Sequence, residues 1–132
     1  MSCETKPASL SHLAVKSAVD VHKCKLSRGN SARHAVSVRN YSAVEVEVEI
    51  EVECPSGAGL EHACGNPWQP PSRYLTASKG GVSTTTFEEY LHAPNAAAGS
   101  GKQQLKLTVR RRPLRQAKWI GKTAPLRDIE VV

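Results

Sequence analysis

Residues 44–53 read Val-Glu-Val-Glu-Val-Glu-Ile-Glu-Val-Glu. Apolar and acidic side chains alternate with a period of two residues, and every apolar position holds a β-branched residue. This pattern predicts a strand with one buried and one exposed face, because successive side chains of a strand point to opposite faces. In a helix the same residues would place Val and Glu on every side and would bury no coherent face. Pro55 and Gly57 end the predicted strand.

Further stretches that alternate with a period of two residues lie on both sides of this strand. They cover residues 13–26, 32–39, 74–78, 82–93, 105–110 and 129–131, with a further short stretch at 114–120. Turn-forming residues separate them, and Lys79-Gly80-Gly81 is typical of a hairpin turn. Seven to eight short strands without a convincing helix predict an all-β fold. We expect an immunoglobulin-like β-sandwich of two antiparallel sheets.

The stretch before the acidic strand supports the same architecture. His34, Val36 and Val38 share one face of the strand predicted over 32–39. Residues 36–52 resemble the hairpin between the second and third strands of many immunoglobulin-like modules. Neither tryptophan falls in the predicted third strand, so the Cys-Trp-Cys core of antibody domains is absent. We expect residues 1–12 to be a flexible N-terminal segment, followed by one domain over residues 13–132.

The charges of the chain are arranged in blocks. The formal net charge is +6, but residues 41–61 carry six glutamates and no base, whereas residues 102–127 carry nine bases and no acid. Glutamates along one strand face repel one another, and a neighbouring strand with bases on the same face relieves that repulsion. The third and sixth strands of an immunoglobulin-like sandwich are neighbours. We therefore expect Lys106, Arg110 and Arg112 to lie beside the acidic strand as a ladder of ion pairs.

The basic C-terminal block is the first candidate binding surface. It contains Arg110, Arg111, Arg112, Arg115 and Lys118, together with Trp119. Clustered cations bind phosphates, and a tryptophan among them can stack on a base. This pattern supports an alternative function, a basic nucleic-acid-associated protein of a ribonucleoprotein or a virion. A ladder with the acidic strand would neutralise part of this surface and weaken that alternative.

The loop around Trp68 is a second candidate. Residues 67–71 read Pro-Trp-Gln-Pro-Pro, a rigid and extended segment. An exposed Trp68 in such a segment would suit a groove on a protein partner. The alternative is a tryptophan that covers one end of the core.

The four cysteines are Cys3, Cys24, Cys54 and Cys64. Their spacing does not match a zinc site, so we expect no metal. We expect free thiols in a reducing compartment, with Cys24 and Cys54 as small core residues. A Cys54–Cys64 bridge is the alternative in an oxidising compartment.

Catalysis finds little support in the sequence. Neither a nucleophile elbow, a phosphate-binding loop nor a His-Glu-x-x-His motif occurs, and the glutamates of one strand face do not converge on a substrate. No apolar run reaches the length of a transmembrane helix, and the first ten residues lack the features of a secretory signal. We expect a non-catalytic, intracellular, cytoplasmic module without a cofactor, which binds a protein partner or serves as a structural component of a larger assembly. The strand predicted over 126–132 could pair with another chain, either a partner or a second copy.

Overall fold

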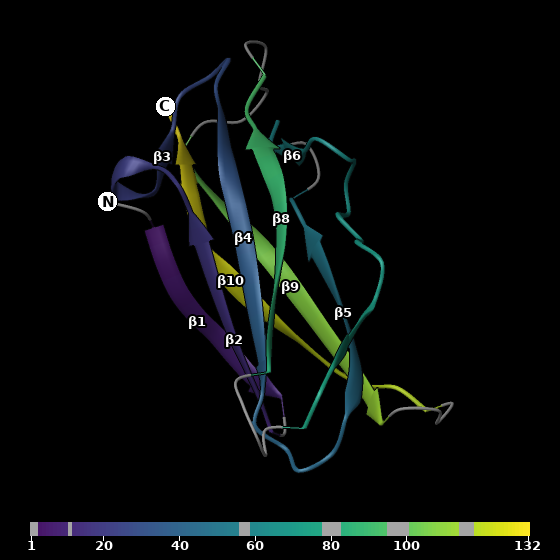
Figure 1. Cartoon of the computed structure of the whole chain (residues 1–132). Helices are drawn as coiled ribbons and strands as arrows, with labels where there is room; N and C mark the ends of the chain where they lie inside the picture. Colours follow the sequence, from purple (N-terminus) through teal and green to yellow (C-terminus); the bar gives the residue numbers. More distant parts are fainter. Residues whose placement is uncertain (1–2, 11, 56–58, 78–82, 95–100, 114–117) are drawn as a thin grey trace.

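The computed structural model describes residues 3–10, 12–55, 59–77, 83–94, 101–113 and 118–132. The fold is the predicted all-β, immunoglobulin-like sandwich, with two five-stranded sheets among the described residues (Figure 1). The first sheet has the order β1-β2-β4-β8-β6 and the second the order β3-β10-β9-β5-β7. In Figure 1, β9 and β10 run diagonally past β2 and β4, so the two layers cross obliquely.

The strands of each sheet are defined as follows. The first sheet contains β1 (Cys3–Leu10), β2 (Leu13–Val19), β4 (Ser31–Asn40), β6 (Glu61–His62) and β8 (Thr84–His92). The second contains β3 (Lys25–Leu26), β5 (Val46–Glu53), β7 (Arg73–Leu75), β9 (Gly101–Pro113) and β10 (Ile120–Val131). A short 3-10 helix, η1 (His22–Cys24), joins β2 to β3. Among the described residues, no helix has the length and apolar character needed to cross a membrane.

The core lies between the inner faces of the two sheets. Val36, Val38 and Phe87 of the first sheet are fully buried, as are Val52 and Leu105 of the second. These positions follow the two-residue period of their strands, so the alternation read from the sequence is what places apolar side chains inside. Burial of such side chains is the main stabilising contribution of a sandwich, about 1.5–3 kcal/mol for each large apolar group.

The acidic strand has the neighbour that its charges predict. Strand β5 pairs antiparallel with β9, and Glu47 lies opposite Arg112, Glu49 opposite Arg110 and Glu53 opposite Lys106. The expected pairing of the acidic and basic blocks within one sheet is therefore confirmed. The register also places the apolar residues of both strands on the same inner face.

Three expectations about the strands differ from the structure. Within the stretch expected to be a flexible N-terminal segment, Cys3–Leu10 forms strand β1 and pairs with β2. The hairpin expected around residues 79–81 does not form, because β7 pairs with β5 in one sheet and β8 with β4 in the other; the turn itself lies outside the described residues. The described strands number ten instead of seven to eight, since β1 and β6 are not predicted from the sequence and the stretch over 13–26 is divided into β2 and β3.

The C-terminal strand, β10, is longer than the strand expected over 126–132 and lies between β3 and β9 in its sheet. It pairs with β9 along its length, and its last two residues pair in parallel with β3 on the other side. This short pairing is an exception to the expected antiparallel arrangement. It covers the very end of the strand, so the segment nearest Val131 is not an open edge.

The cysteines also differ from expectation. Cys3 and Cys24 form a disulfide with a Cα–Cα distance of 5.2 Å, which joins β1 to the end of η1. Cys54 and Cys64 are free, with Cys54 buried and Cys64 exposed. The expectation of four free thiols is therefore wrong for one pair, and the inference of a reducing compartment that rested on it loses that support.

Candidate functional site: the charge ladder and a buried histidine cluster

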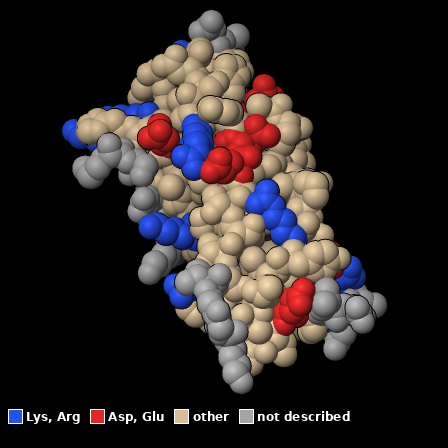
Figure 2. All heavy atoms as spheres, viewed as in Figure 1, with Lys and Arg blue, Asp and Glu red and all other residues tan. Residues whose placement is uncertain are grey.

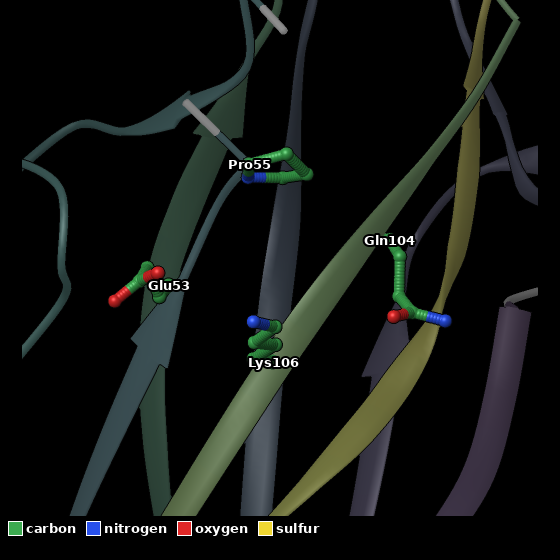
Figure 3. A pocket seen from close by; sticks show the side chains of 4 residues that line it. All are labelled: Glu53, Pro55, Gln104 and Lys106. Atoms are coloured by element: carbon green, nitrogen blue, oxygen red, sulfur yellow. The ribbon is translucent and has the colours of Figure 1, made fainter. Parts of the chain in front are cut away.

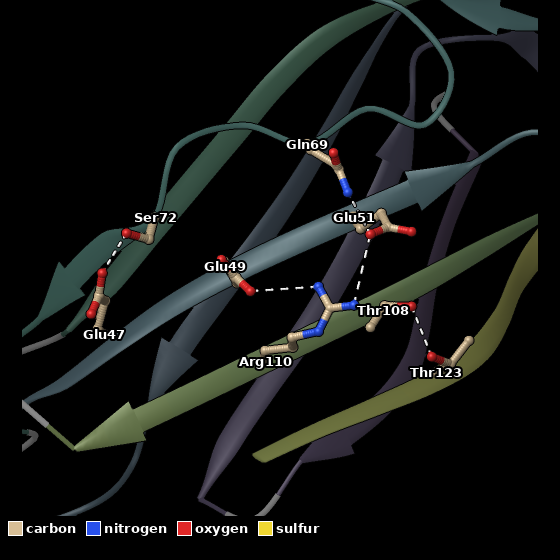
Figure 4. Close-up of polar contacts among 8 residues, drawn as sticks. All are labelled: Glu47, Glu49, Glu51, Gln69, Ser72, Thr108, Arg110 and Thr123. Carbon is tan, nitrogen blue, oxygen red and sulfur yellow. Dashed lines mark hydrogen bonds and ion pairs between the residues drawn. The ribbon is translucent and has the colours of Figure 1, made fainter. Parts of the chain in front are cut away.

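The outer face of β5 and β9 carries a ladder of ion pairs. The Arg110 guanidinium lies 3.5 Å from Glu49 and 3.7 Å from Glu51, and it points between the two carboxylates (Figure 4). Arg112 Nε lies 2.6 Å from Glu47 Oε1. Two guanidinium groups of the basic block are therefore used to neutralise the acidic strand within the same sheet.

Glu47 is the most buried carboxylate of this ladder. Its side chain is 8% exposed, against 32% for Glu49. Hydrogen bonds from the Ser72 hydroxyl and the Arg112 guanidinium lower the pKa of Glu47, so the group stays ionised despite its burial (Figure 4 shows the Ser72 contact). Ser72 comes from the segment before β7, so this contact also fixes the loop after β5 to the sheet.

We expect the Glu47–Arg112 pair to be energetically coupled. In a double-mutant cycle with Glu47→Gln and Arg112→Gln, the interaction energy should be about 1 kcal/mol, because the bond is charge-assisted and largely shielded from water. The matched cycle with Glu49→Gln and Arg110→Gln should give less than about 0.5 kcal/mol, since that pair is longer and more exposed. Urea unfolding of the four chains in each cycle measures both values. Equal coupling in the two cycles would contradict the special position of Glu47.

The residues predicted to bind phosphate do not form one free cationic surface. Arg110 and Arg112 face glutamates, and the Arg112 guanidinium also lies 4.5 Å from the centre of the Trp119 ring. Arg111 is half-buried, Lys118 is exposed, and Arg115 lies outside the described residues. On the face seen in Figure 2, acidic and basic groups are interspersed. Trp119 is covered by its own chain's arginine, which leaves that ring face unavailable to a base.

Trp68 is buried, which contradicts the expectation of an exposed docking residue. Its side chain is 3% exposed, and its backbone forms a two-way bridge with Val52 of β5, at 2.9 and 2.8 Å. The alternative interpretation, a tryptophan that covers one end of the core, agrees with this position. The proline-rich segment over residues 67–71 therefore directs the Trp68 ring into the core.

A chain of buried polar groups crosses the interior beside Trp68. Ser17 Oγ of β2 lies 2.8 Å from His34 Nε2 of β4, His34 Nδ1 lies 2.9 Å from His62 Nε2 of β6, and His62 Nδ1 lies 3.7 Å from Cys54 Sγ. The first three residues belong to one sheet, whereas Cys54 follows β5 of the other. This row of polar side chains therefore links the two sheets. The Trp68 ring packs against both imidazoles.

Burial keeps this cluster neutral. Desolvation lowers the pKa of His34 to about 3 and that of His62 to about 4, and it raises the pKa of the Cys54 thiol to about 12. The imidazoles are uncharged at neutral pH, and Cys54 is a thiol and not a nucleophilic thiolate. The cluster is therefore structural. Within the described residues, no group of three or more His, Cys, Asp or Glu side chains could hold a metal ion.

A surface hollow of about 320 Å³ lies beside the ends of β5 and β9. Glu53, Pro55, Gln104 and Lys106 line it, and Figure 3 shows their side chains spread apart around the opening. Its one acid and one base are opposite each other in the strand register. The hollow therefore offers no excess charge and no converging pair that would select a ligand or support acid–base chemistry.

Comparisons with known proteins support the fold. No model of a known protein family matches the chain, and no curated protein matches it. The chain is similar to the solved GAE domain of GGA2p from Saccharomyces cerevisiae, with a TM-score of 0.57, 13% identity and coverage of 94% of this chain and 97% of that one. It is also similar to an ASH/PapD-like domain of human CEP192, PapD-like domain 7, with a TM-score of 0.54, 11% identity and coverage of 97% and 92%. At this identity the likeness shows a shared β-sandwich fold.

Proposed function

We propose that this chain is a non-catalytic β-sandwich module that binds a protein partner within a larger assembly. The observation that carries the proposal is the exposure of all three tyrosines, Tyr41, Tyr74 and Tyr90, which are 52–61% exposed. Tyrosine is enriched at protein interfaces, because its ring offers a large contact area and its hydroxyl group a hydrogen bond. The two similar structures are named as single domains of larger proteins, which agrees with a module of this kind.

A selection of displayed random peptides on the immobilised chain tests the proposal. We expect an enriched motif whose synthetic peptides bind the folded chain and lose about tenfold in affinity with at least one of the variants Tyr41→Ser, Tyr74→Ser and Tyr90→Ser. Trp119→Ser serves as the control, because that ring already lies against Arg112. A failure to enrich peptides, or affinities that none of the tyrosine variants changes, would count against the proposal.

A titration with heparin and single-stranded RNA at two salt concentrations tests the nucleic-acid alternative. We expect weak binding with a shallow salt dependence, because Arg110 and Arg112 are already paired with glutamates. Each phosphate that is neutralised adds about one unit to the slope of log affinity against log salt, so a steep loss at higher salt would reveal a multi-phosphate grip and revive the alternative. The variant Lys118→Glu then shows whether the exposed end of the basic block takes part.

A further inference from the structure

A second hollow, of about 210 Å³, opens on the outer face of the first sheet. It is lined by the short side chains of Ala14 (β2), Ser37 (β4) and Thr84 (β8), by Val15, and by the longer side chains of Lys16, Arg39 and Tyr41. The strand register explains the hollow: Ala14 and Thr84 flank Arg39 in one cross-strand row, and Ser37 lies beside Lys16 in the next. Small side chains alternate with long ones between neighbouring strands, which leaves a cavity with mostly apolar walls.

The aromatic wall of this hollow is held in place before any ligand arrives. The Tyr41 backbone N–H donates to the His12 carbonyl at 2.7 Å, and the Arg39 guanidinium lies 4.8 Å from the centre of the Tyr41 ring. The side-chain amide of the buried Asn40 donates to the carbonyls of Val44 and Thr76, at 3.0 and 2.9 Å. These bonds fix the turn that follows β4. A preformed wall lowers the entropy cost of binding.

The charge at the rim indicates which partner fits. Lys16 and Arg39 line the hollow, and none of its described lining residues is acidic. The whole chain carries +6, so a second copy of it would be repelled, whereas an acidic segment would be attracted.

We propose that this hollow receives one apolar side chain of an extended acidic segment from a partner protein. The ring or aliphatic group enters beside the short side chains of Ala14, Ser37 and Thr84 and contacts the part of the Tyr41 ring that Arg39 does not cover. A flanking carboxylate lies near Arg39. This inference rests on the proposed function and names the class of partner and one of its contact sites. The apolar walls favour a protein side chain over a phosphate backbone, which has no apolar group to place there.

Titration of isotope-labelled chain with defined peptides tests the inference. The probe is an acetylated, amidated Glu-Asp-Phe-Glu-Asp peptide, compared with Glu-Asp-Gly-Glu-Asp and Lys-Lys-Phe-Lys-Lys. We expect saturable shifts of the Ala14, Ser37 and Thr84 amide signals with the first peptide, at least about tenfold weaker binding of the glycine analogue, and no binding of the basic one.

Matched charge reversals locate the contact. Arg39→Glu should weaken the acidic peptide about tenfold or more, whereas Lys122→Glu, the same kind of charge reversal on an exposed lysine of β10 outside the hollow, should leave it within about twofold. Both positions are exposed, and dispersed amide spectra confirm that each variant is folded. Equal effects of the two reversals would mean that only overall charge matters, which overturns the inference.

Three other outcomes also overturn it. They are shifts that map away from the hollow, equal binding of the glycine or the basic peptide, and stronger shifts of the same signals with single-stranded RNA or anionic lipid vesicles. If the displayed peptides depend on Tyr74 or Tyr90 while the hollow shows no shifts, this inference fails and the proposed function stands. If the selection enriches nothing and the hollow shows no shifts, both fail.

Discussion

We expect the folded chain to lose stability steeply as the pH falls from about 6.5 toward 4, because His34 and His62 are buried without charge. Desolvation lowers the pKa of His34 to about 3, with smaller contributions from the neighbouring His62 and from Arg127. Desolvation also lowers the pKa of His62 to about 4, against an opposing effect of Glu89. In the unfolded chain both imidazoles return to a pKa near 6.5.

The sign of the effect follows from which state binds more protons. Between pH values of about 6.5 and 4, the unfolded chain takes up protons on both histidines, whereas the folded chain does not. The contribution of the two neutral histidines to the free energy of unfolding is therefore fully present above about pH 6.5. Below that pH the free energy of unfolding falls by up to about 1.4 kcal/mol per pH unit for each histidine. Because a small domain is stable by only about 5–15 kcal/mol, two such groups can unfold it within the acidic range.

Urea unfolding at a series of pH values measures this slope, and two variants assign it. His34→Gln should lower stability at neutral pH, since it disturbs the bonds to Ser17 and His62, but it should also flatten the acid dependence. His22→Gln, at an exposed position in η1, should leave both the stability and the slope nearly unchanged. An acid slope that is the same in all three chains would show that other groups cause the unfolding.

The sequence predicts the strands and their pairing well where the two-residue alternation continues over a long stretch. The alternation in residues 44–53 fixes the inner face of β5, and the complementary charges of β5 and β9 identify them as neighbours before any coordinates are known. Local pattern and long-range pairing agree here, because a shift of one residue would bury the glutamates. The same logic places His34 on the inner face with Val36 and Val38.

Other features depend on contacts that no local pattern reveals. His62 lies in a strand of two residues, so nothing in its neighbourhood shows that it meets His34. Cys3 stands in a stretch without periodicity, and the pairing of cysteines cannot be read from their spacing. The hollow beside Tyr41 arises from cross-strand rows of β2, β4 and β8, which requires the register of three strands at once.

The largest effect of a single substitution should come from Trp68→Ala, which we expect to lower the free energy of unfolding by about 3–5 kcal/mol. The Trp68 ring centre lies 5.5 Å from that of His34 and 5.1 Å from that of His62. Removal of the indole ring therefore opens a cavity next to the two hydrogen-bonded imidazoles. The surrounding groups cannot collapse easily into that space, because the imidazoles are held by their own hydrogen bonds. Water that enters the cavity would also ease their protonation in the folded chain, which narrows the pKa difference from the unfolded chain and flattens the acid dependence.

The chain contains a matched control, since Trp119 is its other tryptophan. Trp119→Ala should lower the free energy of unfolding by less than about 1 kcal/mol, because the ring is only half-buried and lies against the Arg112 guanidinium at the surface. Thermal and urea unfolding of both variants measures the difference, and acrylamide quenching of the single remaining tryptophan in each tests exposure independently. Comparable losses of unfolding free energy in the two variants would indicate that Trp68 is exposed and would restore it as a candidate docking residue. A large loss for Trp68 alone would mean that the proline-rich loop closes the core, so that partner contacts must fall on the exposed tyrosines instead.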